Sequence, residues 1–399
     1  MKKIFFRLYQ KLMYFLTIFI SFEEPKIIDG KEALEKVPFI LQKNNKHKVF
    51  VVTDDYLVKT NRFKKMVESL EKLKIQYKIY DQTKPNPSIK MVEEALLVYN
   101  ENQCDALIAY GGGSVIDLAK VVGARVVRPN LSVEKMKGTL KILKKIPLLI
   151  AIPSTVGTGS EATLAAVVSN KDTQDKFAIM DPALMPHYAV LDLDIVKSLP
   201  KKLIGQTGMD ALTHAVEAYI GKANTKKTKR MAKSAVKIIF DNLKKAYDGD
   251  LDALSQMQLA AYQAGVAFTR AYVGNVHAIA HQLSAYYNLG HGYANAVILP
   301  HVLKYYEGKV DKKLAQLMDV LEVDSNKPSH EKAKDFIKEI ENLKIDLDIE
   351  ETFDGLIEEK DKESIVEKAY KEANPLYPVP VILSRKDFRI LIDKINGSE

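Results

Sequence analysis

The stretch DALIAYGGGSVIDLAK, residues 105–120, is predicted to form a buried strand that is followed by three glycines and a serine, after which a helix begins. Glycines let a backbone approach a phosphate closely, and a helix start supplies unpaired N–H groups and the positive end of a dipole. The glycines stand at the carboxyl end of the strand, where open α/β sheets bind their ligands. A tight turn alone also explains GGGS, so the motif leaves the nucleotide interpretation open.

Strands and helices alternate on both sides of this stretch. We expect further strands at HKVFVVTDD (47–55), KIQYKIYD (74–81), PLLIAIPST (147–155) and YAVLDLDIV (188–196). Helices are expected between the strands that begin at residues 47, 74, 105 and 147. Such alternation is typical of a doubly wound parallel sheet with crossover helices. The polar insertion VVSNKDTQDKFAIMD (167–181) is predicted to form a β-hairpin.

The 399-residue chain is too long for one typical core. After about Pro200 the pattern becomes almost continuously helical, which places a domain boundary near Leu203. We therefore expect an apolar N-terminal segment (1–26), an α/β dinucleotide-binding domain (27–203) and an all-helical domain (204–399).

Composition and charge exclude some classes of function. The net charge of +8 is spread along helix faces, and no RNA- or DNA-binding signature accompanies it, so we expect no nucleic-acid partner. Cys104 is the one cysteine, which excludes an internal disulfide and fits a reducing cytoplasm. Its apolar surroundings favour a buried, inert thiol.

The N-terminal residues 4–22 are strongly apolar and aromatic. Their uncharged part, 12–22, is shorter than the roughly 20 residues that span a bilayer. Two interpretations remain: an amphipathic helix docked on the body or on a partner subunit, which we favour, or a helix on a membrane surface.

Four of the eight histidines lie in two short stretches that also hold an aspartate. Asp210 and His214 stand four residues apart, as do His277 and His281, so each pair shares one helix face. His291 follows after a Gly-containing turn. Core or capping roles explain single histidines, but the set indicates a nitrogen/oxygen site for a divalent first-row metal.

Two further signals concern a nucleotide. PSTVGTGSEAT (153–163) follows an apolar strand and is rich in hydroxyls, although a capped connector would have the same composition. Asp54 ends the first clear strand. An acid there can accept hydrogen bonds from a ribose and repel the 2′-phosphate of NADP, which favours NAD; helix capping is the competing interpretation.

Together these elements resemble the iron-containing alcohol dehydrogenase family over roughly residue 27 to the C-terminus. The motifs that carry the resemblance are KPNPS (84–88), GGGSVIDLAK (111–120), PSTVGTGSEAT, DPALMP (181–186), TGMDALTHAVEAY (207–219) and VHAIAHQLSAYYNLGHGYANAVILP (276–300). The family implies reversible hydride transfer between a small alcohol and a nicotinamide, with cofactor and metal meeting in the cleft between the two domains. It also implies a homodimer that associates through the nucleotide domain.

Carried over by position, the resemblance implies ligands for Fe²⁺, or for Zn²⁺ or another divalent metal, and an additional histidine that we consider for proton relay or an orienting role. It further implies contacts to NAD(H). The metal ligands are Asp210, His214, His277 and His291; the additional histidine is His281; the cofactor residues are Asp54, Asn86, Gly112, Gly113, Ser114, Ser154, Thr155, Thr163 and Lys176.

Three expectations remain open. A small alcohol or aldehyde should bind near Phe268, Tyr272 and Leu283, but its identity is undetermined. Asp117 and Lys120, three residues apart, suggest a surface ion pair. The alternatives in function are a synthase related to dehydroquinate synthase, against which the aspartate ligand and fourth ligand argue, and a degenerate scaffold on a membrane, against which the intact metal set argues.

Overall fold

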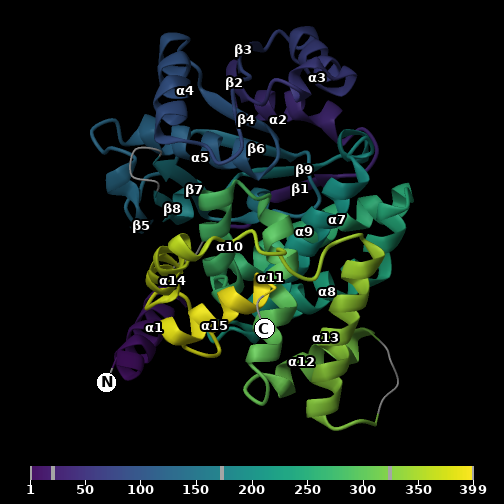
Figure 1. The fold of residues 1–399 in the computed structure, drawn as a ribbon. Helices are drawn as coiled ribbons and strands as arrows, with labels where there is room; N and C mark the ends of the chain where they lie inside the picture. The colour runs from purple at the N-terminus through teal and green to yellow at the C-terminus, as the bar shows by residue number, and fades with distance from the viewer. Residues whose placement is uncertain (1, 19–22, 171–174, 322–325, 398–399) are drawn as a thin grey trace. The chain divides into compact units, whose positions relative to one another are not determined.

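The structure is a computed structural model that describes residues 2–18, 23–170, 175–321 and 326–397. Two compact units make up the chain, one of residues Phe22–Leu199 and the other of Met1–Ser21 with Pro200–Glu399 (Figure 1). The domain boundaries expected from the sequence stay predictions.

The first unit is built on a six-stranded sheet in which every neighbouring pair is parallel. Its order is β1-β9-β6-β4-β2-β3. The strands are β1 (Lys26–Asp29), β2 (Lys48–Val52), β3 (Gln76–Tyr80), β4 (Ala106–Gly111), β6 (Leu148–Pro153) and β9 (Tyr188–Leu191). The expected doubly wound parallel sheet is thus confirmed. Because β2 lies between β3 and β4, the winding reverses at β2, and ligands of such sheets bind beside that point.

The inner strands β2, β4 and β6 are buried on both faces, which explains their nearly continuous apolar runs. In β2, Phe50 and Val52 join one core cluster, whereas Val49 and Val51 join another. Residues of α4 (Ile89–Glu101) and α5 (Gly113–Val127) belong to the first cluster, and residues of α2 (Val37–Lys43) and α3 (Asn61–Lys72) to the second. Helices therefore cover both faces, as crossover connections require.

The predicted insertion is a hairpin of β7 (Ala165–Asn170) and β8 (Asp175–Met180), which pair antiparallel; its turn, 171–174, lies outside the described residues. The short β5 (Gly138–Thr139) adds to β8 in parallel. The strand prediction at 188–196 is wrong beyond Leu191, because the Asp192 carboxylate caps a helical turn, α6 (Leu193–Val196). The sequence pattern also missed the edge strand β1 and helix α2.

The second unit is helical among its described residues, as expected. Its long central helix α7 (Lys201–Ile220) is buried from Gly208 to its end because α8, α9 and α11 pack around it. The remaining helices are α8 (Lys226–Tyr247), α9 (Leu251–Ala271), α10 (Asn275–Tyr287), α11 (His291–Tyr305), α12 (Asp311–Met318), α13 (Ser329–Asp346), α14 (Glu359–Ala373) and α15 (Arg385–Ile395).

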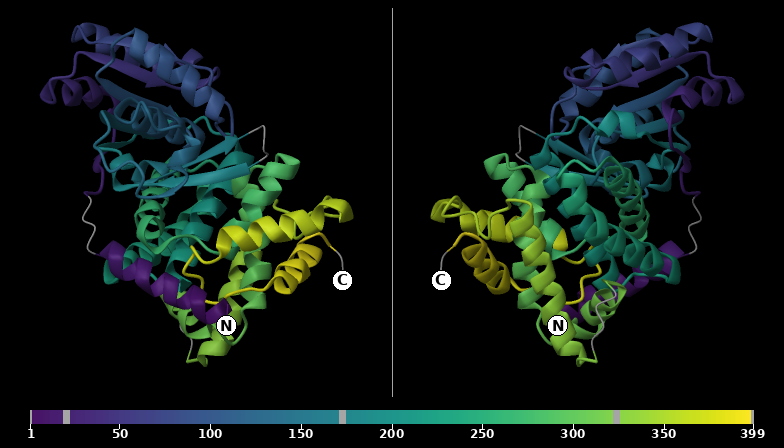
Figure 2. Two further views of the ribbon diagram at one scale, coloured as in Figure 1. Left: turned by 90° about the vertical axis from the view of Figure 1, so that its left-hand side faces the viewer. Right: turned by 90° about the vertical axis from the view of Figure 1, so that its right-hand side faces the viewer.

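The N-terminal helix α1 (Lys2–Ile18) lies alongside the C-terminal segment within the second unit (Figure 2). Gln10 Nε2 donates to the Tyr377 carbonyl at 2.7 Å, and the Arg7 guanidinium donates to the carbonyls of Val379 and Pro380. This contact agrees with docking on the body. Among the described residues, no helix combines the length and the apolar character needed to cross a membrane.

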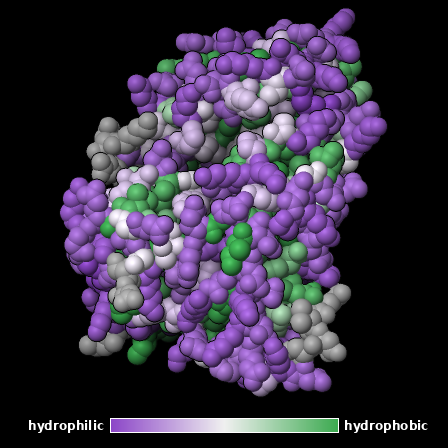
Figure 3. All heavy atoms as spheres, turned by 45° about the vertical axis from the view of Figure 1, so that its right-hand side comes forward, coloured by the Kyte–Doolittle hydropathy of each residue, from purple (hydrophilic) through white to green (hydrophobic). Residues whose placement is uncertain are grey.

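On the face drawn in Figure 3, hydrophilic side chains predominate and apolar side chains gather only in small groups. Most lysines that form ion pairs do so with acids on their own or a neighbouring helix, for example Lys237 with Asp241 and Lys304 with Glu341.

Candidate metal centre and nucleotide-binding residues

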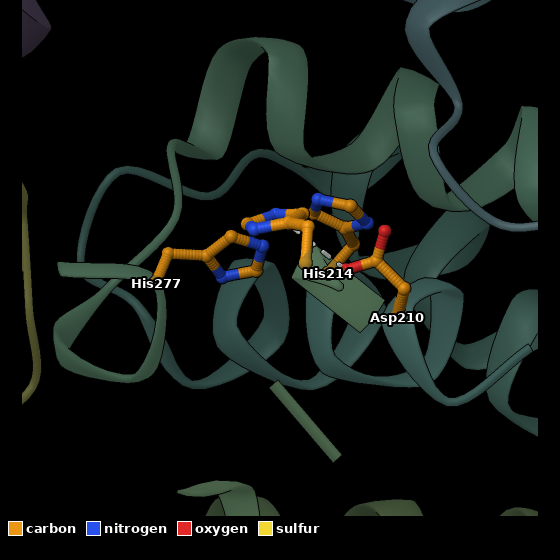
Figure 4. Close-up of side chains that lie close together, drawn as sticks. Asp210, His214 and His277 are labelled. Atoms are coloured by element: carbon orange, nitrogen blue, oxygen red, sulfur yellow. Dashed lines mark ion pairs between the residues drawn. The ribbon is translucent and has the colours of Figure 1, made fainter. Parts of the chain in front are cut away.

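The four predicted metal ligands come together in the helical unit. One ligand atom from each of Asp210, His214, His277 and His291 lies within 4.8 Å of all the others. Asp210 and His214 stand on α7, His277 on α10 and His291 at the start of α11. Figure 4 shows the side chains of Asp210, His214 and His277 directed toward one another. A carboxylate and three imidazoles at these separations match a single divalent metal.

Glycine allows the helices that carry these residues to approach. A Cβ on Gly292, next to His291, would stand 2.4 Å from the Gln206 carbonyl oxygen of α7. Any side chain at position 292 would therefore push the start of α11, and His291 with it, away from Asp210. The GHG sequence at 290–292 thus positions His291 within the cluster.

Asn295, one turn after His291, tests whether a cation fits the cluster. Its amide nitrogen lies 2.7 Å from Asp210 Oδ1 and 3.2 Å from Nε2 of both His277 and His291. Three acceptor atoms thus converge on one NH₂ group, which has two hydrogens. The amide oxygen of Asn295 is buried and has no hydrogen-bond partner within the described part of the chain. Acceptors that converge in this way suit a positive ion, so the donor set fits a metal.

His277 is oriented by a buried carboxylate that sequence reasoning missed. Glu217 Oε2 accepts from His277 Nδ1 at 2.7 Å and from the Gly274 N–H at 2.8 Å, and Oε1 accepts from the Val276 N–H at 2.8 Å. Because Nδ1 donates to the carboxylate, Nε2 carries the lone pair and faces the cluster. A Cβ on Gly274 would stand 2.5 Å from Glu217 Oε1, so glycine is required there.

His281 stands beside the cluster rather than in it. Its ring stacks on that of His291, with centroids 5.0 Å apart. His281 Nδ1 lies 2.5 Å from Glu372 Oε1, and Glu372 also accepts from Gln282 Nε2 and from the Tyr377 hydroxyl. Glu372 therefore holds His281 in one orientation, with Nδ1 as the donor. Sequence reasoning missed Glu372, and nothing in its local spacing points to His281.

Of the three residues expected near the substrate, Phe268 lies against the metal cluster. Its ring stacks on His214 at a centroid distance of 4.2 Å and an interplanar angle of 15°. Tyr272 ends α9 with a φ of 64° and is half-buried, whereas Leu283 is fully buried in α10. Phe268 thus supplies an apolar wall beside the ligands, and Leu283 contributes to the core.

The nucleotide residues lie in the α/β unit, and the first of them follows β2. Asp54 Oδ1 accepts from the N–H groups of Tyr56 and Leu57 at 3.0 and 2.8 Å, which is the capping role considered for it. Its second oxygen makes no hydrogen bond to the rest of the described chain. One oxygen of Asp54 therefore holds the turn, and the other is available for a ribose.

Three predicted cofactor residues meet beyond β4. Lys176 Nζ donates to Asn86 Oδ1 at 2.9 Å, and the Asn86 N–H donates to Ser114 Oγ at 3.3 Å. A Cβ on Gly113 would stand 3.0 Å from Thr158, and one on Gly112 would stand 3.3 Å from Thr155. The glycine loop at the start of α5 is thus closely packed against the loop that follows β6. The N–H groups at this helix start are suited to a phosphate.

The loop after β6 carries the remaining predicted cofactor residues. The Ser154 N–H donates to the Gly111 carbonyl at 3.0 Å, and the Thr155 hydroxyl is buried without a hydrogen-bond partner in the described residues. The Thr163 hydroxyl is 2.9 Å from Lys120 Nζ and is buried. Thr163 thus supports the loop, and its contact to a cofactor stays a prediction.

The interpretation of Asp117 and Lys120 as a surface pair is wrong. Lys120 is fully buried and donates to the carbonyl oxygens of Ser160, Thr163 and Ala165 at 2.7–2.8 Å. Asp117 Oδ1 accepts from the Ser160 hydroxyl and Oδ2 from the Val167 N–H. Burial lowers the pKa of Lys120 to about 8, opposed by the nearby carboxylates. The two side chains fasten the 160–167 segment to α5.

Comparisons with known proteins agree with the site. Residues 24–193 match the model of the iron-containing alcohol dehydrogenase family, and residues 204–395 match the C-terminal model of the Fe-containing alcohol dehydrogenase family. Lactaldehyde reductase of Escherichia coli K12 is 35% identical over 295 residues, which are 73% of this chain and 77% of that protein. Aldehyde-alcohol dehydrogenase 2 of Entamoeba histolytica is 38% identical over 280 residues, 67% of this chain but only 32% of that longer protein. A crystal structure of a 1,3-propanediol oxidoreductase superposes with a TM-score of 0.90 at 31% identity, covering 94% of this chain and 99% of the other.

Proposed function

This chain belongs to the iron-containing alcohol dehydrogenase family and is an oxidoreductase that acts on alcohols and aldehydes, and we propose that it carries out this chemistry with one divalent metal held by Asp210, His214, His277 and His291. The observation that carries the proposal is the convergence of these four donors, with Asn295 and Glu217 aimed at them. A divalent ion in this position supplies Lewis acidity, which acidifies an alcohol hydroxyl and polarises an aldehyde carbonyl.

The side chains around the cluster have separate tasks. Glu217 keeps His277 Nδ1 protonated, so that its other nitrogen faces the metal position. Phe268 stacks on His214 and keeps water from that side of the site. Asp210 is nearly fully buried, and its charge balances part of the metal's charge in a region of low dielectric.

We assign His281 the task of moving the substrate proton. Its Nδ1 is held by Glu372, so in the neutral form of the ring Nε2 is the nitrogen that accepts a proton. An orienting role for His281 would leave the pH dependence of turnover unchanged in a His281→Gln variant. Proton transfer by His281 predicts instead that this variant loses about 10²-fold or more in turnover and recovers part of it at high pH.

The cofactor we propose is NAD(H) rather than NADP(H). The proposal rests on Asp54, whose second carboxylate oxygen is available for ribose hydroxyls and would repel a 2′-phosphate. We further propose that backbone N–H groups of Gly112, Gly113 and Ser114, at the start of α5, bind the pyrophosphate, with the hydroxyl of Thr155 and the amine of Lys176 as additional polar groups.

The substrate we propose is a small alcohol or its aldehyde. One relative carries the name lactaldehyde reductase, and Phe268 presents an aromatic surface next to the ligands. We also propose a cytoplasmic homodimer. Support for the compartment comes from Cys104, which is the one cysteine of the sequence and a free thiol. Sedimentation equilibrium that finds only monomer would contradict the dimer.

The deciding experiment is NADH oxidation by iron-reconstituted protein under argon, with butanal, propanal and lactaldehyde as substrates. We expect metal-dependent turnover that His277→Ala abolishes together with metal binding. His301→Ala is the control, because His301 lies on α11 but bonds to the Glu351 carbonyl, away from the four donors. Preference for NADPH would contradict the role of Asp54. Absence of turnover with every carbonyl, despite bound metal and nucleotide, would contradict the function.

A further inference from the structure

A cavity of about 1030 Å³ lies between the N-terminal helix and the body of the helical unit. Its walls are α1, the end of α7, the segment 308–313 at the start of α12, the start of α13 and the segment 380–382. The volume is at the upper end of the range of roughly 300–1000 Å³ that is usual for small-molecule sites. None of the residues discussed above as metal ligands or cofactor contacts lines it.

Cationic side chains surround this cavity. They are Lys3, Arg7 and Lys11 of α1, Lys222 after α7, and Lys309, Lys312 and Lys313 around the start of α12. None of these seven forms an ion pair with a residue in the described ranges. Asp311 is the one acidic residue among the lining residues, and its carboxylate accepts from the Gly308 N–H at 2.8 Å. The cavity is therefore strongly positive.

The cations raise one another's energy. Burial lowers the pKa of Lys313 to about 8, and Lys229 and Lys222 lower it further. Burial also lowers the pKa of Lys222, with Arg7 and Lys11 adding to the effect. A protein that holds several cations together without acidic partners favours an anion at that place. An anion here would relieve the repulsion.

Most of the remaining lining is apolar, although Ser329 and His330 at the start of α13 also reach the cavity. The apolar side chains are those of Ile4, Leu8, Ile220, Val310, Pro380, Val381 and Ile382. Along α1, Lys3, Arg7 and Lys11 recur every four residues and form one stripe, and Ile4 and Leu8 form the adjacent stripe. Ile4 and Leu8 keep 67% and 62% of their surface exposed, so an apolar strip open to water runs beside the row of positive charges.

The α1 wall is fixed by specific contacts. Arg7 donates to the carbonyls of Val379 and Pro380 at 2.6 and 2.8 Å, and Gln10 is buried and donates to the Tyr377 carbonyl. These bonds hold α1 in place, while Lys3 and Lys11 form no ion pair within the described ranges; Lys3 is near enough to Asp387 of α15 to help lower the pKa of that carboxyl. The cavity is thus prepared before a ligand arrives, which reduces the entropic cost of binding.

We propose that this cavity binds a single-chain amphiphilic anion, with a carboxylate or phosphate head among the lysines and an alkyl chain along Ile4, Leu8 and the 380–382 segment. The charged rim recognises the head, and the apolar strip removes the chain from water. Neither a small inorganic anion nor an uncharged detergent satisfies both parts of the lining. The proposal is independent of the dehydrogenase activity.

The test is calorimetric titration of the full-length, metal-loaded protein with dodecyl phosphate and with dodecanoate, each below its micelle concentration. We expect saturable binding of one molecule per chain. Inorganic phosphate and dodecyl maltoside, which carry the head or the tail alone, should bind at least about tenfold more weakly. The stronger of the two anions identifies the head group that the lysines prefer.

Substitutions test the charged part and the apolar part of the cavity one at a time. Lys309→Gln with Lys312→Gln should weaken binding of the amphiphile at least about tenfold. Lys245→Gln with Lys338→Gln is the matched control, because both lysines are exposed in the same unit and do not line the cavity. Leu8→Gln tests the tail independently, since its exposure means that the fold tolerates the change. All variants should retain NADH oxidation.

Four outcomes would overturn the proposal. These are absence of saturable binding, equal binding by the lysine variants and the control, equal binding of dodecyl maltoside, and sedimentation with anionic phosphatidylserine vesicles without binding of the monomeric amphiphiles. The last result would assign α1 to a membrane surface instead of a ligand cavity.

Discussion

Glu217→Gln should weaken metal binding although Glu217 is not one of the ligands. The substitution keeps the shape of the side chain but replaces one acceptor oxygen by a donor NH₂. In the protein, Oε2 faces the Gly274 N–H and His277 Nδ1, and Oε1 faces the Val276 N–H. Whichever way the amide turns, at least one buried N–H meets another donor.

The magnitude follows from these three hydrogen bonds. If the amide oxygen faces Gly274 and His277, the Val276 N–H loses its acceptor, which costs about 1–3 kcal/mol in a buried site. The bond to His277 also loses its charged partner and with it roughly half of its strength. Changes to a carboxylate that orients a metal-bound histidine typically weaken metal affinity about 10–100-fold, which is about 1.4–2.7 kcal/mol.

The assay is competition for Zn²⁺ or Fe²⁺ between the protein and a chromophoric chelator, with urea unfolding of the metal-free protein measured in parallel. Glu341→Gln is the matched control, because Glu341 pairs with Lys304 on the surface of the same unit and its loss should change affinity less than about twofold. Wild-type metal affinity in a folded Glu217→Gln variant would refute the reasoning. In that case Glu217 would serve only to shape the loop that enters α10.

The other predictions concern packing, the nucleotide loop and pH. Gly292→Ala should destabilise the helical unit by about 1–3 kcal/mol in urea unfolding, because its Cβ meets the Gln206 carbonyl, whereas Gly290→Ala, whose Cβ stands 3.6 Å from the Gln206 side chain, should cost less. Lys120→Met should destabilise the α/β unit by about 2–4 kcal/mol and weaken NADH binding, because three buried carbonyls lose their donor; NADH affinity equal to wild type in a folded variant would contradict the supporting role of Lys120. Burial raises the pKa of Glu161 to about 7, from an ordinary value of 4.5 in the unfolded chain, so between these values the folded state binds more protons and stability falls as pH rises. Glu161→Gln should remove that slope, gaining stability at pH 8 and little at pH 4, as measured by thermal unfolding.

The α/β unit could be predicted from its sequence where burial is two-sided. Strands β2, β4 and β6 are apolar apart from Lys48 at the start of β2, because helices cover both faces, and that pattern is visible in a single sequence. Strand β1 escaped the prediction because it is four residues long at the sheet edge and largely exposed, so no apolar run marks it. The strand predicted to continue to Val196 failed because Asp192 forms a cap, a local polar contact that hydrophobic pattern does not report.

The spacing of Asp117 and Lys120 in the sequence did not predict the environment of their side chains. Asp117 and Lys120 stand three residues apart, which is the spacing of an exposed helix pair and equally of two side chains turned into a core. The two cases differ in the partners of the side chains. Lys120 donates to three carbonyl oxygens in the 160–165 segment, which lies forty or more residues further along the chain. A single sequence carries no record of such distant partners.

Helix α7 carries two residues that the sequence pattern identified, Asp210 and His214, and one that it missed, Glu217. Asp210 and His214 could be proposed as ligands because histidines are rare in this chain and concentrate at ligand spacing. Glu217 follows three residues after His214 and therefore lies on the same face of α7, yet Glu on a helix is usually a solvated residue. Its role depends on Gly274, Val276 and His277, which reach it only when α10 packs against α7. Sequence can therefore propose the donors that hold a metal, but the groups that orient those donors are defined by the packing of helices. Once the fold is known, the feature to look for is a buried carboxylate among the helices that carry the proposed ligands.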